Sequence, residues 1–189
     1  MRVLVALLLA VSAHAGDVRN VTWGMTEAEV RAAEPAKPIE AGDGTLRYAT
    51  SDFSSADEAI VYAFQYGRLV RASYLFTPEH TEPNEFISDF HAVAAKLAVK
   101  LPKPDEERNI WLDDSLQNER IAYLEQDRAL PSDILPSDKQ AGLAIALGHL
   151  RITATWKTPR TKILHTMTGS DHKIRHQVEF SSVERFSGE

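Results

Sequence analysis

The sequence contains no cysteine among its 189 residues. Disulfide bridges are therefore excluded, and so is the bacterial lipoprotein anchor, which needs an acylated cysteine at its cleavage site. No apolar run reaches the roughly 20 residues that a helix needs to span a bilayer. The longest run, Val3 to Val11, has nine residues. The folded chain must therefore be held together by packing alone, without a membrane anchor of its own.

The motifs of several enzyme classes are also missing. There is no G-x-S-x-G elbow, no G-x-x-x-x-G-K phosphate loop and no cysteine nucleophile. The acidic runs Asp105-Glu106-Glu107 and Asp113-Asp114 are typical of solvated loops, in which carboxylates keep ordinary pKa values. The sequence therefore indicates a protein that is not an enzyme, with no catalytic residues and no cofactor.

Charge of positive sign is scarce. The chain has 21 lysines and arginines against 27 acids, a net charge of −6, which becomes −7 without Arg2. A net negative charge repels polyanions over long range. We therefore expect no nucleic-acid partner.

The first fifteen residues have the layout of a secretory signal peptide. Met1-Arg2 supplies a positive charge, Val3 to Val11 is apolar, and Ser12 to Ala15 ends in an A-x-A pattern. We expect residues 1–15 to be removed near Ala15. The mature chain of about 174 residues would then be periplasmic or secreted.

A short helix is predicted directly after this segment. Thr26 and Glu29 have the spacing of a capping box, and Met25 and Val30 that of a hydrophobic staple. The helix should run from Glu27 to about Glu34, because prolines follow at positions 35 and 38.

Three strands should follow this helix. A turn at Gly42-Asp43-Gly44 precedes a strand over 45–50, and strands over 59–65 and 68–77 flank Tyr66-Gly67. The pattern predicts a helix followed by a three-stranded antiparallel meander.

A similar arrangement is predicted for the second part of the chain. Apolar residues at helical spacing predict a long core-facing helix that ends before Pro102: Phe86, Phe90, Val93, Leu97 and Leu101. Beyond it we expect a short strand at 110–112 and helical structure at 116–127, then a loop at 130–139. A hairpin of 143–147 with 150–157 should turn at Gly148, and a hairpin of 162–168 with 173–181 should turn at Gly169-Ser170.

The predicted fold class is α+β, with two helix-plus-three-stranded antiparallel meander units packed together. The first unit would cover residues 16–80, and the second residues 81–189, with an insertion at about 113–140. Both units place a glycine at a hairpin turn, which suggests a weak internal repeat.

Two segments carry a family resemblance. Asn20-Val21-Thr22-Trp23-Gly24-Met25-Thr26 with Glu29-Val30 resembles the opening N-x-x-W-G-M-[ST]-x-x-E-V of uncharacterised bacterial exported proteins. The region from Ala144 to Ser182, including Gly148-His149-Leu150 and Trp156-Lys157-Thr158, is similar to the C-terminal half of those proteins. This resemblance implies a fold and no particular chemistry.

More distantly, tandem helix-plus-meander units resemble the β-lactamase inhibitor proteins and the small outer-membrane assembly lipoproteins. Those folds present a sheet face or loops to a protein partner, so the resemblance implies a binding role. This chain departs from the lipoproteins in lacking the acylated cysteine, and from the inhibitors in lacking disulfides.

The sharpest candidate for chemistry is the histidine set His165, His172 and His176. With a turn at Gly169-Ser170, strand alternation places all three on one sheet face, with His165 diagonal to the other two at about 7–8 Å. Imidazoles at that distance could share zinc or copper. The simpler interpretation is a half-buried sheet face, because Ile163, Met167 and other apolar residues share it and no carboxylate does, so we expect no metal site.

Aromatic residues offer a candidate binding patch. Trp156 alternates with apolar residues and Trp23 adjoins the first helix, so both should lie in the core. Trp111 and Tyr66 are the aromatics expected to be exposed, and they are the candidate partner-binding residues.

The leading hypothesis is an exported, non-catalytic protein that binds another protein or an envelope component. The alternative is an exported hydrolase or metal-binding protein that uses the sheet histidines. An open cleft lined by those histidines would favour the alternative, and burial of their face beneath the long helix would remove it.

Overall fold

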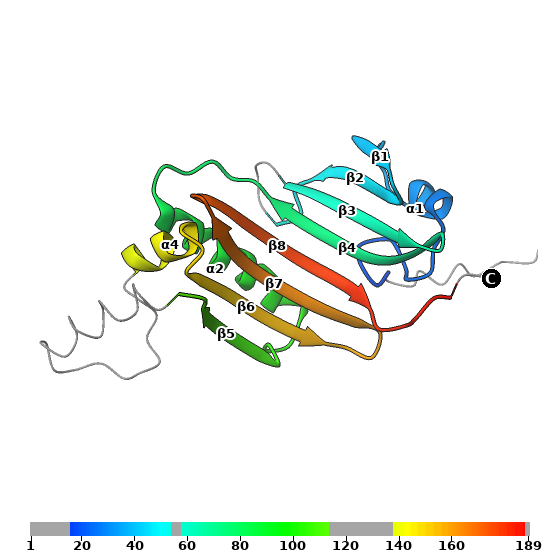
Figure 1. Cartoon of the computed structure of the whole chain (residues 1–189). Helices are drawn as coiled ribbons and strands as arrows, with labels where there is room; N and C mark the ends of the chain where they lie inside the picture. The colour runs from blue at the N-terminus through cyan, green and yellow to red at the C-terminus, as the bar shows by residue number, and fades with distance from the viewer. Residues whose placement is uncertain (1–15, 54–57, 114–137, 188–189) are drawn as a thin grey trace, which may run out of the picture.

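The computed structural model describes residues 16–53, 58–113 and 138–187. The predicted signal peptide, the predicted helical segment at 116–127 and the predicted loop at 130–139 up to residue 137 therefore lie outside the described residues, while residues 138 and 139 begin a helix. The described chain is an α+β fold with one eight-stranded antiparallel sheet and three helices. In the view of Figure 1 the long helix passes behind the strands. None of the described helices is long and apolar enough to cross a bilayer.

The elements follow one another along the chain in two runs, each beginning with a helix. The first run is α1 (Glu27–Ala33), β1 (Glu40–Gly42), β2 (Thr45–Thr50), β3 (Glu58–Gln65) and β4 (Arg68–Phe76). The second is α2 (Pro83–Lys100), β5 (Glu106–Trp111), α4 (Asp138–Ala146), β6 (Leu150–Lys157), β7 (Thr161–Ser170) and β8 (Lys173–Ser182).

The strand order across the sheet is β1-β2-β3-β4-β8-β7-β6-β5. Each run therefore supplies four adjacent strands, and the two groups meet where β4 pairs antiparallel with β8. The expectation of three-stranded meanders was wrong in both halves, since β1 adds a strand to the first and β5 extends over six residues in the second.

Helix α1 forms as the sequence predicts. The Thr26 hydroxyl accepts from the Glu29 amide, and the Glu29 carboxylate accepts from the Thr26 amide at 2.7 Å. These bonds satisfy two backbone groups that a helix start otherwise leaves open, and they lower the pKa of Glu29. Val30 points from the helix into the core.

The β3–β4 hairpin is also confirmed. Tyr66 and Gly67 have φ angles of 51° and 70°, the left-handed values that a tight two-residue hairpin turn requires. The pairing of Gln65 with Arg68 closes the turn.

Helix α2 is the long helix that the apolar spacing predicts. It buries Ile87, Phe90, Val93 and Leu97 against the sheet. Together with Val30 of α1, these side chains cover a single face, on which the apolar core lies.

One strand prediction was wrong, because residues 143–147 belong to α4 and its C-terminal turn. Helix α4 packs against α2 and the ends of β6 and β7. The approach is very close, since a Cβ on Gly142 would lie 2.4 Å from the carbonyl oxygen of Pro83, and one on Gly169 would lie 2.2 Å from that of Ile145. A short apolar run cannot be assigned to helix or strand by periodicity alone.

The β7–β8 turn also differs from its prediction. Asp171 and His172 occupy the turn with φ angles of 49° and 61°, and Ser170 pairs with Lys173. The turn therefore lies two residues later than predicted, and each β7 residue pairs with a β8 residue four positions further along the chain. Because this shift is an even number of residues, the predicted faces of the strands remain correct while the predicted partners do not.

Candidate functional site

Two of the three candidate histidines meet in the core. His165 pairs with Val178 and Met167 pairs with His176, so the two histidines are diagonal neighbours on β7 and β8, as expected. Their Nε2 atoms lie 2.8 Å apart. His165 is fully buried and His176 is 3% exposed.

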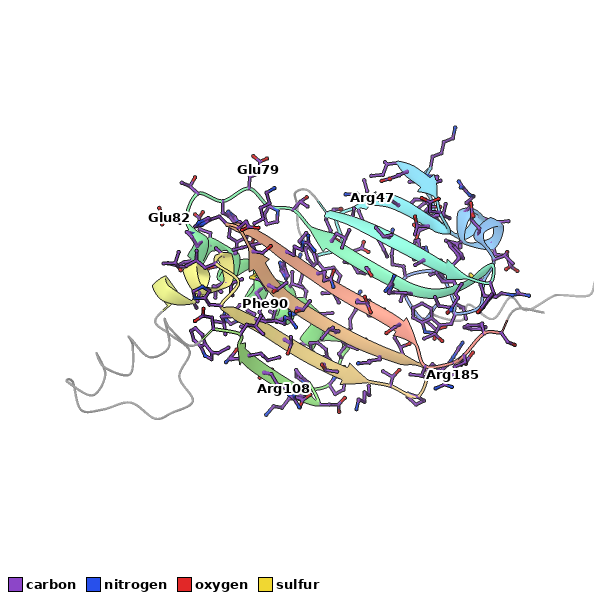
Figure 2. The ribbon with its side chains drawn as sticks, viewed as in Figure 1. Arg47, Glu79, Glu82, Phe90, Arg108 and Arg185 are labelled. Atoms are coloured by element: carbon purple, nitrogen blue, oxygen red, sulfur yellow. The ribbon has the colours of Figure 1, made fainter. Side chains whose placement is uncertain are left out.

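Helix α2 covers this pair. The ring of Phe90 stacks on His165 at a centroid distance of 3.8 Å, and Phe76 lies 4.5 Å from the ring of His176. Figure 2 shows Phe90 behind the strands, on the side of the helices. Burial lowers the pKa of His165 to about 2, with a further contribution from His176, and lowers that of His176 to about 3. Both rings are therefore neutral at pH 7.

The neutral pair makes one hydrogen bond and leaves two ring atoms without partners. One Nε2 must donate to the other, so one Nδ1 is a bare acceptor and the other carries a proton. Neither Nδ1 has a hydrogen-bond partner in the described structure. Such buried atoms lower stability relative to bonded ones.

His172 does not join the pair. It lies exposed in the β7–β8 turn, where its amide donates to the carbonyl of Ala146. The described residues contain no group of three histidine, aspartate or glutamate side chains that could hold a metal ion. The three candidate histidines therefore do not come together, because the turn falls at position 172 itself and α2 buries the other two rings.

A second cluster of ionisable groups lies beneath β2, β3 and β4. Arg19 contacts the carboxylates of Glu34 at 3.5 Å and Asp52 at 3.4 Å, while Tyr62 and Tyr74 donate to the same two carboxylates. We call these five residues the Arg19 cluster. Burial opposes the charge of Arg19, but the two acids outweigh it and raise its pKa. Burial and the adjoining acids raise the pKa of Tyr62 and Tyr74.

The Arg19 cluster joins three parts of the chain. It ties the segment before α1 to the end of that helix and to two central strands. The tyrosine hydroxyls donate to the two carboxylates, and Glu34 is 6% exposed. The Arg19 cluster therefore stabilises the fold, since its buried charges are paired and hydrogen-bonded.

The two candidate aromatic residues have different environments. Tyr66 is 65% exposed at the β3–β4 turn, where it borders a shallow hollow with Val70, Arg185 and Phe186. Trp111 is half-buried and packs against the core under α2 and α4, contrary to the expectation that it is exposed. Trp156 and Trp23 are buried, as expected.

A cavity of about 560 Å³ lies between α2 and strands β5 and β6. Small residues on both walls, Ala94 and Ala98 of the helix and Ala154 of β6, leave the gap unfilled. Polar residues also line it, because Glu107 and Asn109 occupy inward positions of the edge strand. This cavity could accept a small apolar group.

A Ser-x-x-Lys spacing occurs at Ser170 and Lys173. In penicillin-interactive enzymes this spacing brings a serine nucleophile beside a lysine within an enclosed site. Here the two residues face each other across the β7–β8 turn, and both are exposed. The spacing follows from the hairpin and forms no enclosed site.

The face of the sheet opposite the helices is uncovered by any described element. Figure 1 shows no described helix or strand in front of the central strands. We define the open face as the outward positions of the eight strands, which alternate with the buried ones. Near its centre Gln177 pairs with Leu75 and Thr166, and Thr166 pairs with Thr153.

Cations predominate on the open face, although the whole chain is acidic. Figure 2 shows two of them, Arg47 and Arg108, near opposite margins of the sheet. The cations at outward positions are Arg47, Arg71, Arg108, Arg151, Lys157, Lys162, Lys173 and Arg175. The acids at outward positions are Glu40, Glu106 and Glu179. Eight cations against three acids make this face positive in a chain of net charge −6.

All three acids are already paired. Arg47 contacts Glu40 at 3.9 Å, Arg71 contacts Glu179 at 3.8 Å, and Arg108 is paired with Glu106. Five cations remain, and within the described ranges none of them forms an ion pair: Arg151, Lys157, Lys162, Lys173 and Arg175. We call them the β6–β8 cations. All five are exposed.

The position of the β6–β8 cations was not foreseen from the sequence. Strand alternation could have placed each on the outward face of its own strand. It could not show that β6, β7 and β8 are adjacent or which side of the sheet the helices cover, and both facts are needed to see one positive surface. Comparisons of the chain with protein-family models, curated proteins and solved structures give no match.

Proposed function

We propose that this protein is an exported, non-catalytic binding protein whose partner is another protein, docked on the open face of the sheet. The single observation that carries the proposal is a broad sheet surface that no described element covers. Export rests on the signal-peptide pattern of residues 1–15.

The size of the open face supports the proposal. Eight strands spaced about 4.8 Å apart extend for roughly 34 Å across the sheet, and six residues of strand extend for about 20 Å along it. The area, on the order of 700 Å², is close to the ~800 Å² that each partner contributes to a standard protein–protein interface.

The composition of the open face supports the same conclusion. Its central rows mix hydroxyl and amide groups with aliphatic side chains, as in Thr153, Gln177, Leu75 and Leu164. Interfaces between separately folded proteins have this mixed character, whereas a face meant for the core is uniformly apolar. An antiparallel sheet can leave such a face to solvent until a partner arrives.

A photo-crosslinking residue at Gln177 tests the proposal. It lies at the centre of the open face, between β4 and β7. We expect irradiation in a cell-envelope fraction to give one dominant protein adduct, identified by mass spectrometry. The matched control carries the crosslinker at Val99, which is 85% exposed on α2. The proposal is overturned if position 177 gives no adduct, or if position 99 gives the same one.

A further inference from the structure

We propose that the partner presents an acidic surface, and that the β6–β8 cations are its contact residues. This inference rests on the proposed function and specifies the chemistry of the partner. The observation behind it is the concentration of unpaired positive charge on three adjacent strands of an acidic protein.

The β6–β8 cations lie near the two ends of these strands. At one end Lys157 faces Lys162 directly across β6 and β7. At the other end Arg175 pairs with Thr168, and Arg151 lies on β6 opposite Ile110 of β5. Arg151 and Lys157 are six residues apart on one strand, which separates them by about 20 Å. A single partner surface can therefore reach both groups at once.

The opposed lysines are an unfavourable feature of the isolated protein. Like charges directly across an antiparallel pair repel each other. Asp105 accepts a hydrogen bond from the backbone amide of Lys157 at 2.6 Å and, within the described residues, forms no ion pair with either ammonium group. A carboxylate from a partner, placed between Lys157 and Lys162, would relieve the repulsion.

The surroundings of the cations favour a protein over a phosphate polymer. Hydroxyl groups of Thr153 and Thr155, both half-buried, lie between the two charged ends, where polar protein side chains could bond to them. Two acids, Glu106 on β5 and Glu179 on β8, interrupt any continuous positive track. The net charge of the chain also repels a polyanion at long range.

A defined acidic peptide tests the inference. The probe is a fluorescein-labelled peptide of about twelve residues with alternating Glu and Thr, measured by anisotropy in low salt. We expect binding that weakens as salt is added, because charge attraction is screened. Two comparison probes carry the alternative chemistries: a charge-matched oligothymidylate, and vesicles of phosphatidylglycerol and phosphatidylcholine. Tighter binding of either than of the peptide overturns the inference.

A charge-reversed variant locates the binding. Lys157→Glu with Lys162→Glu should weaken peptide binding by at least about tenfold. The control, Lys37→Glu with Lys103→Glu, changes the net charge equally at exposed positions outside the sheet and should leave binding within about twofold. Equal loss in both variants overturns the inference, since a general charge effect would then explain binding.

The crosslinker at Gln177 separates this inference from the proposed function. If the adduct at position 177 survives Lys157→Glu with Lys162→Glu and the peptide does not bind, the acidic partner is wrong and docking on the open face stands. If no adduct forms at position 177, docking on the open face itself is wrong.

Discussion

The Nε2 atoms of His165 and His176 lie 2.8 Å apart in the core, beneath the ring of Phe90. The pair shares one hydrogen bond and is surrounded by apolar side chains. Neither ring can take a proton without placing a charge where water does not reach, so the folded protein holds both rings neutral far below the usual pKa of 6.5.

The histidine pair should make the fold sensitive to acid. In the unfolded chain both rings bind protons as the pH falls below about 6.5, whereas in the folded protein they do so only near pH 3 and pH 2. The unfolded state therefore gains protons first, and the free energy of unfolding should fall as the pH is lowered from about 6.5 toward 3. The slope should approach about 2.7 kcal/mol per pH unit for two groups. Urea unfolding at pH 7, 6, 5 and 4 measures it.

A double variant isolates this effect. His165→Leu with His176→Leu keeps the side-chain volume close to that of histidine and removes both titrating groups. We expect the slope of its free energy of unfolding against pH to be smaller, by up to the contribution of two protons. A slope equal to that of the unmodified protein would show that other groups cause the acid sensitivity.

Replacing one of the opposed lysines should stabilise the protein. Lys162→Glu converts the repulsion with Lys157 into attraction across β6 and β7. The expected gain is about 0.2–1 kcal/mol in low salt, seen as a higher melting temperature and reduced by added salt. Lys103→Glu, in the loop before β5, should have little effect. A lower melting temperature for Lys162→Glu would contradict the pairing of these strands.

The Arg19 cluster should matter far more for stability than a surface ion pair. Glu34→Gln removes the buried charge that faces Arg19 and accepts from Tyr62, so we expect a loss of about 1–3 kcal/mol in urea unfolding. Glu27→Gln breaks the exposed pair with Arg31, 2.7 Å apart, and should cost less than about 0.5 kcal/mol. Similar losses of unfolding free energy in the two variants would contradict a stabilising role of the buried Arg19 cluster.

Close packing of α4 should depend on Gly169. Gly169→Ala places a Cβ 2.2 Å from the carbonyl oxygen of Ile145, so α4 must move or detach at a cost of about 1–3 kcal/mol. Hydrogen exchange should then increase at the His172 amide, which donates to Ala146. Gly42→Ala meets no atom within 4 Å and should leave stability nearly unchanged. Wild-type protection of the His172 amide in Gly169→Ala would contradict this packing.

Local signals in the sequence predicted local structure well. The capping box at Thr26 and Glu29 and the turn at Tyr66-Gly67 involve residues that are neighbours along the chain, so their chemistry can be read from spacing alone. The apolar spacing of α2 likewise predicted that Phe90, Val93 and Leu97 are buried, although it did not include Ile87. The division into two units and the export of the chain stay predictions.

The glycine at position 169 shows where local reading failed. A glycine between two predicted strands usually marks a turn. Here Gly169 lies within β7, and its missing side chain lets the backbone of α4 approach, while Asp171 and His172 make the turn. The short apolar run at 143–147, which was predicted as a strand, belongs to α4 and its C-terminal turn. Both errors come from one tertiary contact between segments more than twenty residues apart.

The sequence by itself determined which side chains face the core, because burial follows from the alternation of apolar and polar residues along each strand and helix. It placed His165 and His176 on one face of the sheet. Only the tertiary structure decided what each face of the sheet meets. Strand order and register brought the two imidazoles within hydrogen-bonding distance under α2, and the same order gathered five cations on the side that no described helix covers. Pairing between distant strands depends on contacts across the whole sheet, and no local spacing encodes them.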